Sequence, residues 1–228
     1  MTDASETPDL LAGKTVALLG GTGPQGRGLA RRFALAGLPV VLGSRSVERG
    51  EEAAAALAEA TGGQVTGSDN VGAAQAGDVV LVVVPWDGHK ELLQELAPHL
   101  EGKVVVDCVN PLGFDKQGAY ALQVEEGSAA QQAQAVLPGS TVVGAFHNVS
   151  AVLLEDPEVA SVETDVLVLG DDRAATDLVQ QLVDRIPGMR GVFGGRLRNA
   201  HQVEALTANL ISINRRYKAH AGIRVTDV

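Results

Sequence analysis

The residues from Gly21 to Gly26 have the spacing of a turn that binds phosphates. They read Gly-Thr-Gly-Pro-Gln-Gly, a GxGxxG pattern that follows a short apolar run and precedes a stretch with helical spacing. Gly21 permits a tight turn, Gly23 has no Cβ to block a pyrophosphate, and Gly26 lets helix and strand pack closely. Free N–H groups at the start of a helix attract phosphate. This context predicts a dinucleotide site rather than an ordinary glycine-rich turn.

The end of the second predicted strand selects between two dinucleotides. A site for NAD usually places a carboxylate there, which binds the ribose 2'-hydroxyl. This chain has Gly43-Ser44-Arg45 instead, and Arg49 follows one helical turn later. A hydroxyl and two guanidinium groups would bind a 2'-phosphate, which a carboxylate would repel. We therefore expect NADP(H), although a capping role for Ser44 and solvated roles for Arg45 and Arg49 also fit the pattern.

Three further segments follow predicted strands and would share the edge of a parallel sheet where ligands bind. They are Val84-Pro85-Trp86, Val109-Asn110-Pro111 and His147-Asn148. Asn110 could hold a carboxamide or a ribose, and Trp86 could cover a flat ring or fill the core. His147 is a candidate general acid, but a histidine at a strand end is more typical of a structural residue. We therefore assign no catalytic residue from the sequence.

The sequence predicts neither a metal centre nor a reactive thiol. No His, Cys or carboxylate residues have metal-ligand spacing, and the single cysteine, Cys108, lies in an apolar strand end without a partner thiol. The edge thus offers a cofactor site without an acid–base pair. Hydride transfer between two organic rings fits such a site, because it needs alignment at roughly 3–3.5 Å rather than a strong side-chain acid.

Strands and helices must alternate to bring these segments to one edge, and the apolar pattern does alternate. Apolar runs predict strands over Lys14–Gly20, Pro39–Leu42, Asp78–Val84, Lys103–Val106, Thr141–Phe146 and Asp165–Leu169. Helical spacing predicts helices over Gly26–Ala36, Val47–Ala60, His89–Leu100, Ala174–Ile186 and Asn199–Tyr217. We predict an α/β Rossmann-type fold, a doubly wound parallel sheet with a smaller, mostly helical C-terminal part. The polar segment Gly113–Gln134 breaks the alternation and predicts a loop with a helix.

Length and composition limit the domain organisation and the partners. The 228 residues are 45% hydrophobic, which suits one large domain or one and a half. We expect a disordered lead over residues 1–12, an NADP-binding domain over 13–150 and a smaller domain over 151–228. A net charge of −10 argues against nucleic acid or an anionic membrane as partner. We expect no signal peptide or membrane span, and one cysteine suits a reducing, cytoplasmic compartment.

Five stretches of the chain carry a family resemblance. They read VALLGGTGPQGRGLA, GSR, VVVPW, GAFHNVSA and RNAHQVEALTANLISIN. Together they resemble the NADPH-dependent oxidoreductases that reduce coenzyme F420, an 8-hydroxy-5-deazaflavin, and the resemblance extends from Lys14 to the C-terminus. It implies a two-part fold, a homodimer, and reversible hydride transfer between nicotinamide C4 and deazaflavin C5.

The resemblance also implies roles for single residues. The phosphates and ribose of NADP would be held by Thr22, Gly23, Pro24, Gln25, Ser44, Arg45 and Arg49. Residues along the cofactor would be Val84, Val109 and Asn110. Near the contact between the two rings would lie His147, Asn148 and Ala151. Near the deazaflavin, in the C-terminal domain that also makes the dimer contacts, would lie Leu206, Thr207 and Ala221.

Two features of the C-terminal part agree with this resemblance. Residues 190–228 carry seven Lys or Arg and two acids, so a basic patch could attract the anionic deazaflavin, unless these are solvated charges on an exposed face. The predicted last helix carries an apolar stripe of Val203, Leu206, Leu210 and Ile213. Such a stripe is too apolar to leave in water, which predicts a homodimer built on this helix.

Two other functions remain open at this point. One is an NADPH-dependent reductase of a small imine or keto substrate, which would need a Lys, His or Tyr acid in the cleft. The other is a non-catalytic NADPH-sensing domain, which would bind the cofactor without turnover.

Overall fold

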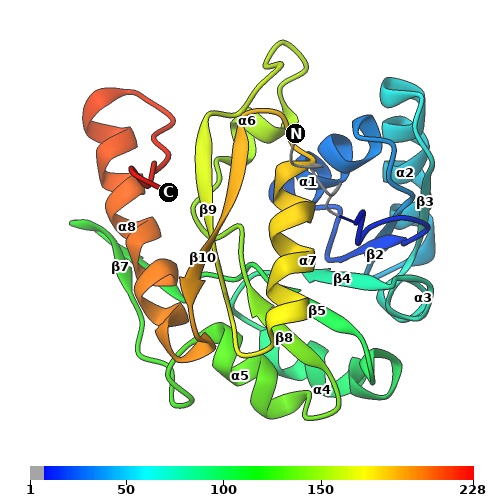
Figure 1. Ribbon diagram of the computed structural model, residues 1–228, viewed down its shortest axis with the longest axis horizontal. Helices are drawn as coiled ribbons and strands as arrows, with labels where there is room; N and C mark the ends of the chain where they lie inside the picture. Colours follow the sequence, from blue (N-terminus) through cyan, green and yellow to red (C-terminus); the bar gives the residue numbers. More distant parts are fainter. Residues whose placement is uncertain (1–7) are drawn as a thin grey trace, which may run out of the picture.

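The computed structural model describes residues 8–228, which fold around an eight-stranded sheet (Figure 1). The strand order is β10-β9-β8-β5-β4-β1-β2-β3. Within residues 8–228, every pair of neighbouring strands in this sheet is parallel except the pair of β8 and β9. A hairpin of β6 and β7 lies apart from this sheet. The strands are β1 (Val16–Leu19), β2 (Val40–Ser44), β3 (Val65–Asp69), β4 (Val79–Val82), β5 (Val104–Asp107), β6 (Leu112–Asp115), β7 (Gly118–Ala121), β8 (Thr141–Gly144), β9 (Thr164–Gly170) and β10 (Met189–Gly195).

Helices cover both faces of the sheet, and each face has its own apolar core. Leu29, Phe33 and Leu178 belong to the core under α1, α2, α6 and α7. Leu93 and Ala130 belong to the core under α3, α4 and α5. The helices are α1 (Pro24–Leu35), α2 (Val47–Thr61), α3 (Asn70–Ala76), α4 (His89–Leu100), α5 (Ala129–Val136), α6 (Ala151–Glu155), α7 (Arg173–Asp184), the 3-10 turn η1 (Leu197–Asn199) and α8 (Ala200–Tyr217).

Side chains at the helix starts fix where several helices begin. Ser46, Asp69, Ser128 and Asp172 each accept a hydrogen bond from a backbone N–H in the first turn of the following helix. Gly62 ends α2 in the left-handed conformation, which glycine adopts without a Cβ penalty. These capping residues explain why the helices begin where they do.

The chain changes direction in the sheet between β1 and β4. From β1 it proceeds to β2 and β3 on one side, whereas β4, β5 and β8 lie on the other. The two halves of such a sheet leave a crevice beyond the carboxyl ends of the strands at this switch point. The glycine turn follows β1 directly, so it opens into that crevice.

The predicted Rossmann-type fold is confirmed, and each predicted strand and helix lies within two residues of an observed one. The pattern missed β3, α3, α6 and β10. It also predicted a loop and a helix over Gly113–Gln134, where the structure has the β6–β7 hairpin before α5. The two missed strands, β3 and β10, are only partly buried and carry too little apolar alternation to be recognised.

One strand pairing departs from the predicted parallel sheet. β9 runs antiparallel to β8, with Gly144 opposite Leu169. The connection between them contains only the five-residue helix α6. A strand parallel to β8 would require a crossover connection that brings the chain back to the end of the sheet where β8 begins. The connection from β8 to β9 does not return to that end before β9 starts. As a result, the start of β9 extends past the end of β8, beside residues 147 and 148.

The predicted disordered lead is wrong for residues 8–12. Leu11 is 1% exposed and belongs to the first core, and the backbone N–H of Leu10 donates to Gln181 Oε1 at 2.9 Å. The rest of that lead, residues 1–7, lies outside the described residues. The division near residue 150 stays a prediction, because β9 and β10 extend the same sheet. Within residues 8–228, no helix combines the length and the hydropathy needed to cross a bilayer.

Candidate functional site

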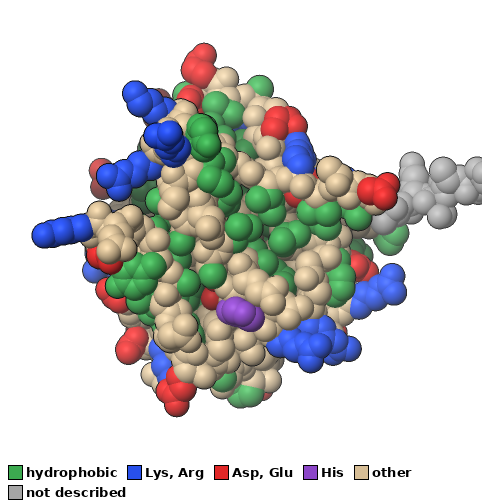
Figure 2. Space-filling view, turned by 90° about the vertical axis from the view of Figure 1, so that its left-hand side faces the viewer, with side chains coloured by type: hydrophobic (Ala, Val, Ile, Leu, Met, Phe, Trp, Pro, Cys, Tyr) green, Lys and Arg blue, Asp and Glu red, His purple; other side chains and the backbone are tan. Residues whose placement is uncertain are grey.

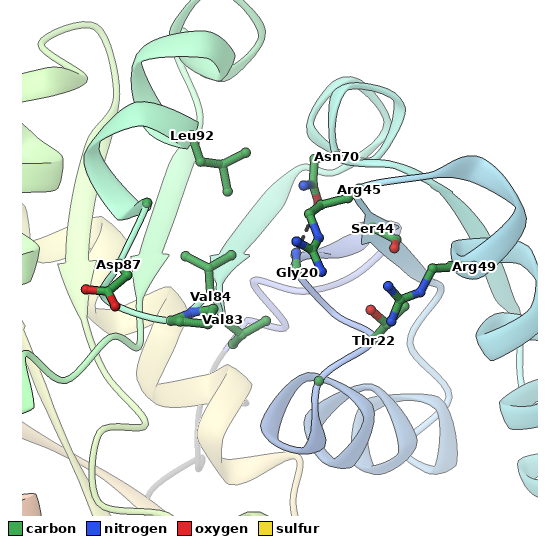
Figure 3. A pocket seen from close by; sticks show the side chains of 13 residues that line it. Gly20, Thr22, Ser44, Arg45, Arg49, Asn70, Val83, Val84, Asp87 and Leu92 are labelled. Carbon is green, nitrogen blue, oxygen red and sulfur yellow. Dashed lines mark hydrogen bonds between the residues drawn. The ribbon is translucent and has the colours of Figure 1, made fainter. Parts of the chain in front are cut away.

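A cavity of about 500 Å³ lies at the switch point, beyond the ends of β1, β2 and β4 (Figure 3). The glycine turn, the end of β2, the start of α2 and the segment between β4 and α4 all contribute to it. Its lining residues are Gly20, Thr22, Gly23, Ser44, Arg45, Arg49, Asn70, Val83, Val84, Pro85, Asp87, Gly88 and Leu92. Six of the predicted site residues are therefore brought together: Thr22, Gly23, Ser44, Arg45, Arg49 and Val84.

The three motif glycines meet different constraints. A Cβ on Gly26 would lie 2.6 Å from the Gly21 Cα, so this glycine lets α1 pack on the turn. A Cβ on Gly21 would lie 2.7 Å from Leu42 Cδ2, so this glycine lets the turn pack on the strands. A Cβ on Gly23 would meet no atom closer than 3.7 Å. Protein packing therefore does not require glycine at position 23, whereas close approach of a phosphate to the backbone does.

The first turn of α1 is open to an anion. Gly23 is the N-cap and offers no side chain to the N–H groups that follow, while Pro24 occupies the exposed first position. Asn70 Oδ1 accepts from the backbone N–H of Gly20 at 3.0 Å and so fixes the turn. The sequence reading missed Asn70. The only local signal was the Asp69-Asn70 pair where β3 ends and α3 begins, and the sequence pattern did not reveal that strand.

Ser44, Arg45 and Arg49 form the polar wall of the cavity. Ser46, not Ser44, caps α2, since Ser46 Oγ accepts from the Arg49 backbone N–H at 3.4 Å. Both arginine side chains are exposed, and neither forms an ion pair with a carboxylate of residues 8–228. Figure 3 shows Arg45 extending toward Gly20 and Arg49 toward Thr22. A hydroxyl and two unpaired guanidinium groups suit a phosphate monoester.

A second group of predicted residues meets at the backbone of His147, outside this cavity. Asn110 Nδ2 and Thr207 Oγ1 both donate to the His147 carbonyl, at 2.9 and 2.8 Å. Gln25 Nε2 donates to the Phe146 carbonyl at 3.0 Å, which ties α1 to the same segment. Phe146 has a φ of +61°, a conformation that costs an L-residue about 1–2 kcal/mol. This strained turn is stabilised by side chains from α1, from α8 and from the segment between β5 and β6.

The His147 side chain is buried, and neither ring nitrogen has a hydrogen-bond partner among residues 8–228. Burial lowers the pKa of His147 to about 4, so the ring is neutral near pH 7. The side-chain oxygens of Asn110 and Asn148 also lack partners within this range. Each buried polar atom without a partner costs about 1–3 kcal/mol, so such a group is typical of a site that binds a polar ligand.

Asn148 belongs to a different part of this edge. Its Nδ2 donates to the Asp165 carbonyl at 2.8 Å, and the Asp165 carboxylate binds Arg190, Arg224 and the backbone N–H of Val225. The hydrogen bond from Arg190 outweighs burial and holds the pKa of Asp165 well below its usual range. This carboxylate therefore fastens the C-terminal residues along β9.

The expected basic patch is smaller than the sequence suggested. Arg190 and Arg224 are paired with Asp165, and Arg196 lies 3.6 Å from Asp171. The remaining cations, with no ion pair in the described part of the chain, are Arg198, Arg215, Arg216 and Lys218. The sequence could not reveal this, because the partner acids lie 20 or more residues away.

The other predicted residues are dispersed. Val109 is buried behind the edge, Ala151 begins α6, and Leu206 is half-buried on α8. The backbone N–H of Ala221 donates to Asn214 Oδ1 at 2.6 Å. Burial raises the pKa of the Cys108 thiol well above its usual value, which agrees with an inert residue.

The parallel sheet, the crevice at its switch point and the glycine turn define a dinucleotide-binding protein of the Rossmann type. The family described as NADP oxidoreductase, coenzyme F420-dependent, matches residues 15–111. F420-dependent NADP reductases of Methanothermobacter thermautotrophicus and Methanocaldococcus jannaschii are 38% and 37% identical over 93% of this chain, and the matches span 95% and 98% of those proteins. The chain belongs to this family of F420-dependent NADP reductases.

Solved structures agree at the level of the fold. A structure from Arthrobacter sp. FB24, assigned as an F420-dependent NADP reductase, has a TM-score of 0.80 at 24% identity, over 94% of this chain and all of that one. An imine reductase of Bacillus cereus has a TM-score of 0.63 at 16% identity, over 90% of this chain and 63% of that one. The fold alone therefore does not choose between these reactions.

Proposed function

We propose that the protein transfers a hydride reversibly between NADP(H) and the deazaflavin coenzyme F420. The observation that carries this proposal is the wall of Ser44, Arg45 and Arg49 beside an open glycine turn, in a chain of this family. When bound, NADPH supplies a hydride from nicotinamide C4, deazaflavin C5 accepts it, and one proton is taken up. The residues of this chain bind and align the two rings.

The proposed roles follow the two groups of residues in the structure. The cofactor phosphates and ribose bind to Thr22, Gly23, Pro24, Gln25, Ser44, Arg45 and Arg49. The dinucleotide continues along Val84, Val109 and Asn110. The rings meet near His147, Asn148 and Ala151, and the deazaflavin lies near Leu206, Thr207 and Ala221. The unpartnered polar atoms of Asn110, His147 and Asn148 support a polar ring substituent at this place.

Mixing the purified protein with NADPH and oxidised F420 tests the function. We expect loss of the deazaflavin absorbance together with oxidation of NADPH, and much slower loss with NADH. A small cyclic imine serves as the control acceptor. Reduction of the imine but not of F420 would favour an imine reductase, and NADPH binding without any turnover would favour a sensor.

The state of His147 makes a prediction for the chemistry. Because burial keeps its ring neutral above about pH 4, the residue cannot supply an imidazolium proton near pH 7. We expect His147→Ala to lower kcat by less than the roughly 10²–10⁴-fold that loss of a general acid causes. The measurement is kcat between pH 5.5 and 8.5, with the half-buried His99→Ala as control. A loss beyond 10³-fold, with a pH limb that vanishes in the variant, would make His147 the acid.

The assembly is proposed to be a homodimer that uses α8 and the β6–β7 hairpin. The stripe on α8 is partly covered within the chain, because Val203 and Leu210 are buried, which corrects the expectation that it is free. Exposed hydrophobic residues remain beside it: Phe114, Tyr120, Ile213 and Tyr217. Hydrophobic side chains are spread over this side of the molecule, with Lys and Arg mostly near its margins (Figure 2).

Sedimentation at micromolar concentration tests the dimer. We expect the wild type to sediment as a dimer, and Ile213→Asp to shift it toward monomer because a carboxylate would be buried in the contact. Leu35→Asp on α1, at a similarly exposed residue, is the matched control and should remain dimeric. A monomeric wild type would end this proposal.

The compartment and the domain division are the remaining proposals. We place the reaction in the cytoplasm, since the one cysteine, Cys108, is free and buried, as suits a reducing environment. We retain a cofactor domain over residues 13–150 and an acceptor part over 151–228. The support for that division is the direction of β9. This strand runs antiparallel to β8 and begins beside Asn148, whereas a parallel strand would begin at the opposite edge of the sheet.

A further inference from the structure

A buried cluster of polar and charged side chains lies behind the cavity and has no role in the proposed reaction. His89 at the start of α4 and Asp107 at the end of β5 are both fully buried, and His89 Nε2 lies 2.7 Å from Asp107 Oδ2. Gln132 of α5 closes the other side, with its Oε1 3.0 Å from His89 Nδ1. Three elements distant in sequence therefore meet at one imidazole ring.

The surrounding hydrogen bonds fix the orientation of Gln132. Its Nε2 donates to Glu126 Oε2 at 3.0 Å, and Lys90 Nζ lies 2.8 Å from the other oxygen of Glu126. Hydrogen bonds from Lys90 and from Gln132 lower the pKa of Glu126, so this carboxylate is ionised and can only accept. Gln132 must therefore present its oxygen, and not its amide nitrogen, to His89.

The same hydrogen bonds fix the protonation of His89. One ring nitrogen faces a carboxylate and the other faces an amide oxygen, and both partners only accept. We therefore assign hydrogen to both ring nitrogens, which makes the buried ring, facing the Asp107 carboxylate, an imidazolium. Burial by itself would lower the pKa of His89, but the hydrogen bond and charge of Asp107 and the contact with Gln132 outweigh it and raise that pKa.

The imidazolium joins two segments that border the cofactor site. The Trp86 ring stacks on His89, with centroids 5.5 Å apart and planes at 30°, and a cation attracts an aromatic face. Trp86 lies within residues 83–88, which contribute most of the cavity wall after β4. On the other side, Asp107 Oδ1 accepts from the backbone N–H of Val109 at 3.1 Å, next to Asn110.

We infer that His89 is a charged positioning residue, which holds residues 83–88 and 107–110 in the arrangement that aligns the nicotinamide ring. The inference rests on the proposed function for the identity of the hydride acceptor. Because Ser44, Arg45 and Arg49 bind the far end of the cofactor, loss of the charge lowers the rate of hydride transfer more than the affinity for NADPH. The charge is present below the raised pKa of His89 and is lost as pH rises through it.

Other charges face this ring and must be separated from it in any pH profile. Glu204 of α8 accepts from the backbone N–H groups of Ala129 and Ala130, and burial raises its pKa to about 7. One contact further out, Glu126 is held by Lys90 and by Gln132. His147 interacts with the Asp107 charge and is neutral near pH 7. Glu204 is thus the group whose titration would overlap with that of His89.

Nitrogen NMR of the free protein tests the charge without any turnover. With ¹⁵N-histidine, we expect both ring nitrogens of His89 to stay protonated to a higher pH than those of an ordinary histidine. The spectrum of His89→Gln assigns the signals. Loss of a ring proton from His89 at or below the pH at which an ordinary histidine loses it would overturn the inference. Since neither NADPH nor F420 is present, this failure is distinct from failure of the proposed function.

Single-turnover kinetics test the positioning role. Gln132→Leu removes the acceptor of Nδ1 but leaves the contact with Asp107, so His89 can become neutral. We expect the alkaline limb of the hydride-transfer rate to move down by about one to two pH units, as loss of one charge-assisted hydrogen bond implies. The Michaelis constant for NADPH should change less than about threefold.

Matched variants separate this effect from general damage. Gln131→Leu on the same helix, which has no hydrogen bond to the cluster, should leave the limb in place. In the Glu204→Gln background the shift caused by Gln132→Leu should persist, which excludes Glu204 as its source. An alkaline limb that is the same in wild type and Gln132→Leu would overturn the inference. If F420 is not reduced, NMR titration of the His89 ring nitrogens in Gln132→Leu replaces the kinetic test. The inference is overturned if His89 titrates at the same pH in this variant and in the wild type.

Discussion

Arg45→Ala is expected to raise the Michaelis constant for NADPH by about 10-fold to 150-fold and to leave that for NADH nearly unchanged. The reason is that a hydrogen bond to a charged group contributes about 1.5–3 kcal/mol, and only NADPH carries the 2'-phosphate. Arg45 and Arg49 form no ion pairs within residues 8–228, so their charges are available to that phosphate. Steady-state kinetics with both cofactors measure the ratio.

Two further variants sharpen this result. Arg45→Ala combined with Arg49→Ala should abolish most of the preference for NADPH, while Arg173→Ala, which removes an exposed arginine far from the cavity, should change neither constant. Arg45→Lys should recover part of the affinity, since it restores the charge but not the paired donors. Equal losses for NADPH and NADH would show that these arginines do not bind the 2'-phosphate.

The cofactor end of the site was predictable because its signals are local. The glycine turn from Gly21 and the residues at the end of β2, as far as Arg49, lie within 28 positions of each other in the chain, and their chemistry follows from residue type. Asn70, which fixes the turn through Gly20, could not be recognised, because β3 before it has one buried apolar residue and no clear alternation. A strand is recognised in a sequence by the apolar residues that it buries, and this edge strand buries few of them.

The remainder of the site depends on contacts between distant segments. Asn110 and Thr207 meet at the His147 carbonyl, and they are 37 and 60 positions from it in the chain. His89, Asp107 and Gln132 each look unremarkable in their own elements, and only the parallel pairing of β4 with β5 brings the first two together. The excess of positive charge over residues 190–228 was misleading for the same reason. Asp165 neutralises Arg190 and Arg224, which follow it by 25 and 59 positions in the chain.

Deuterium placed on C4 of NADPH is expected to appear on C5 of the reduced deazaflavin without loss to water. An indirect route needs a protein group that can hold two electrons or exchange a hydrogen with solvent. Cys108 is buried, and its thiol has no partner thiol to form a disulfide, because it is the only cysteine of the chain. His147 is buried and neutral, and its ring nitrogens contact no relay within the described residues. Direct transfer between aligned rings is what remains.

The label experiment gives an all-or-none result, read by proton NMR or mass spectrometry of the reduced F420. A second reaction, with unlabelled NADPH in deuterated water, should place no deuterium on C5, since only the proton that accompanies the hydride comes from solvent. The rate should also fall severalfold with labelled NADPH if transfer limits turnover. His147→Ala should retain the label as fully as the wild type, because its ring stores no hydrogen of the reaction. Label lost to water, or deuterium entering C5 from the solvent, would require a group on the protein that carries the hydrogen between the two rings.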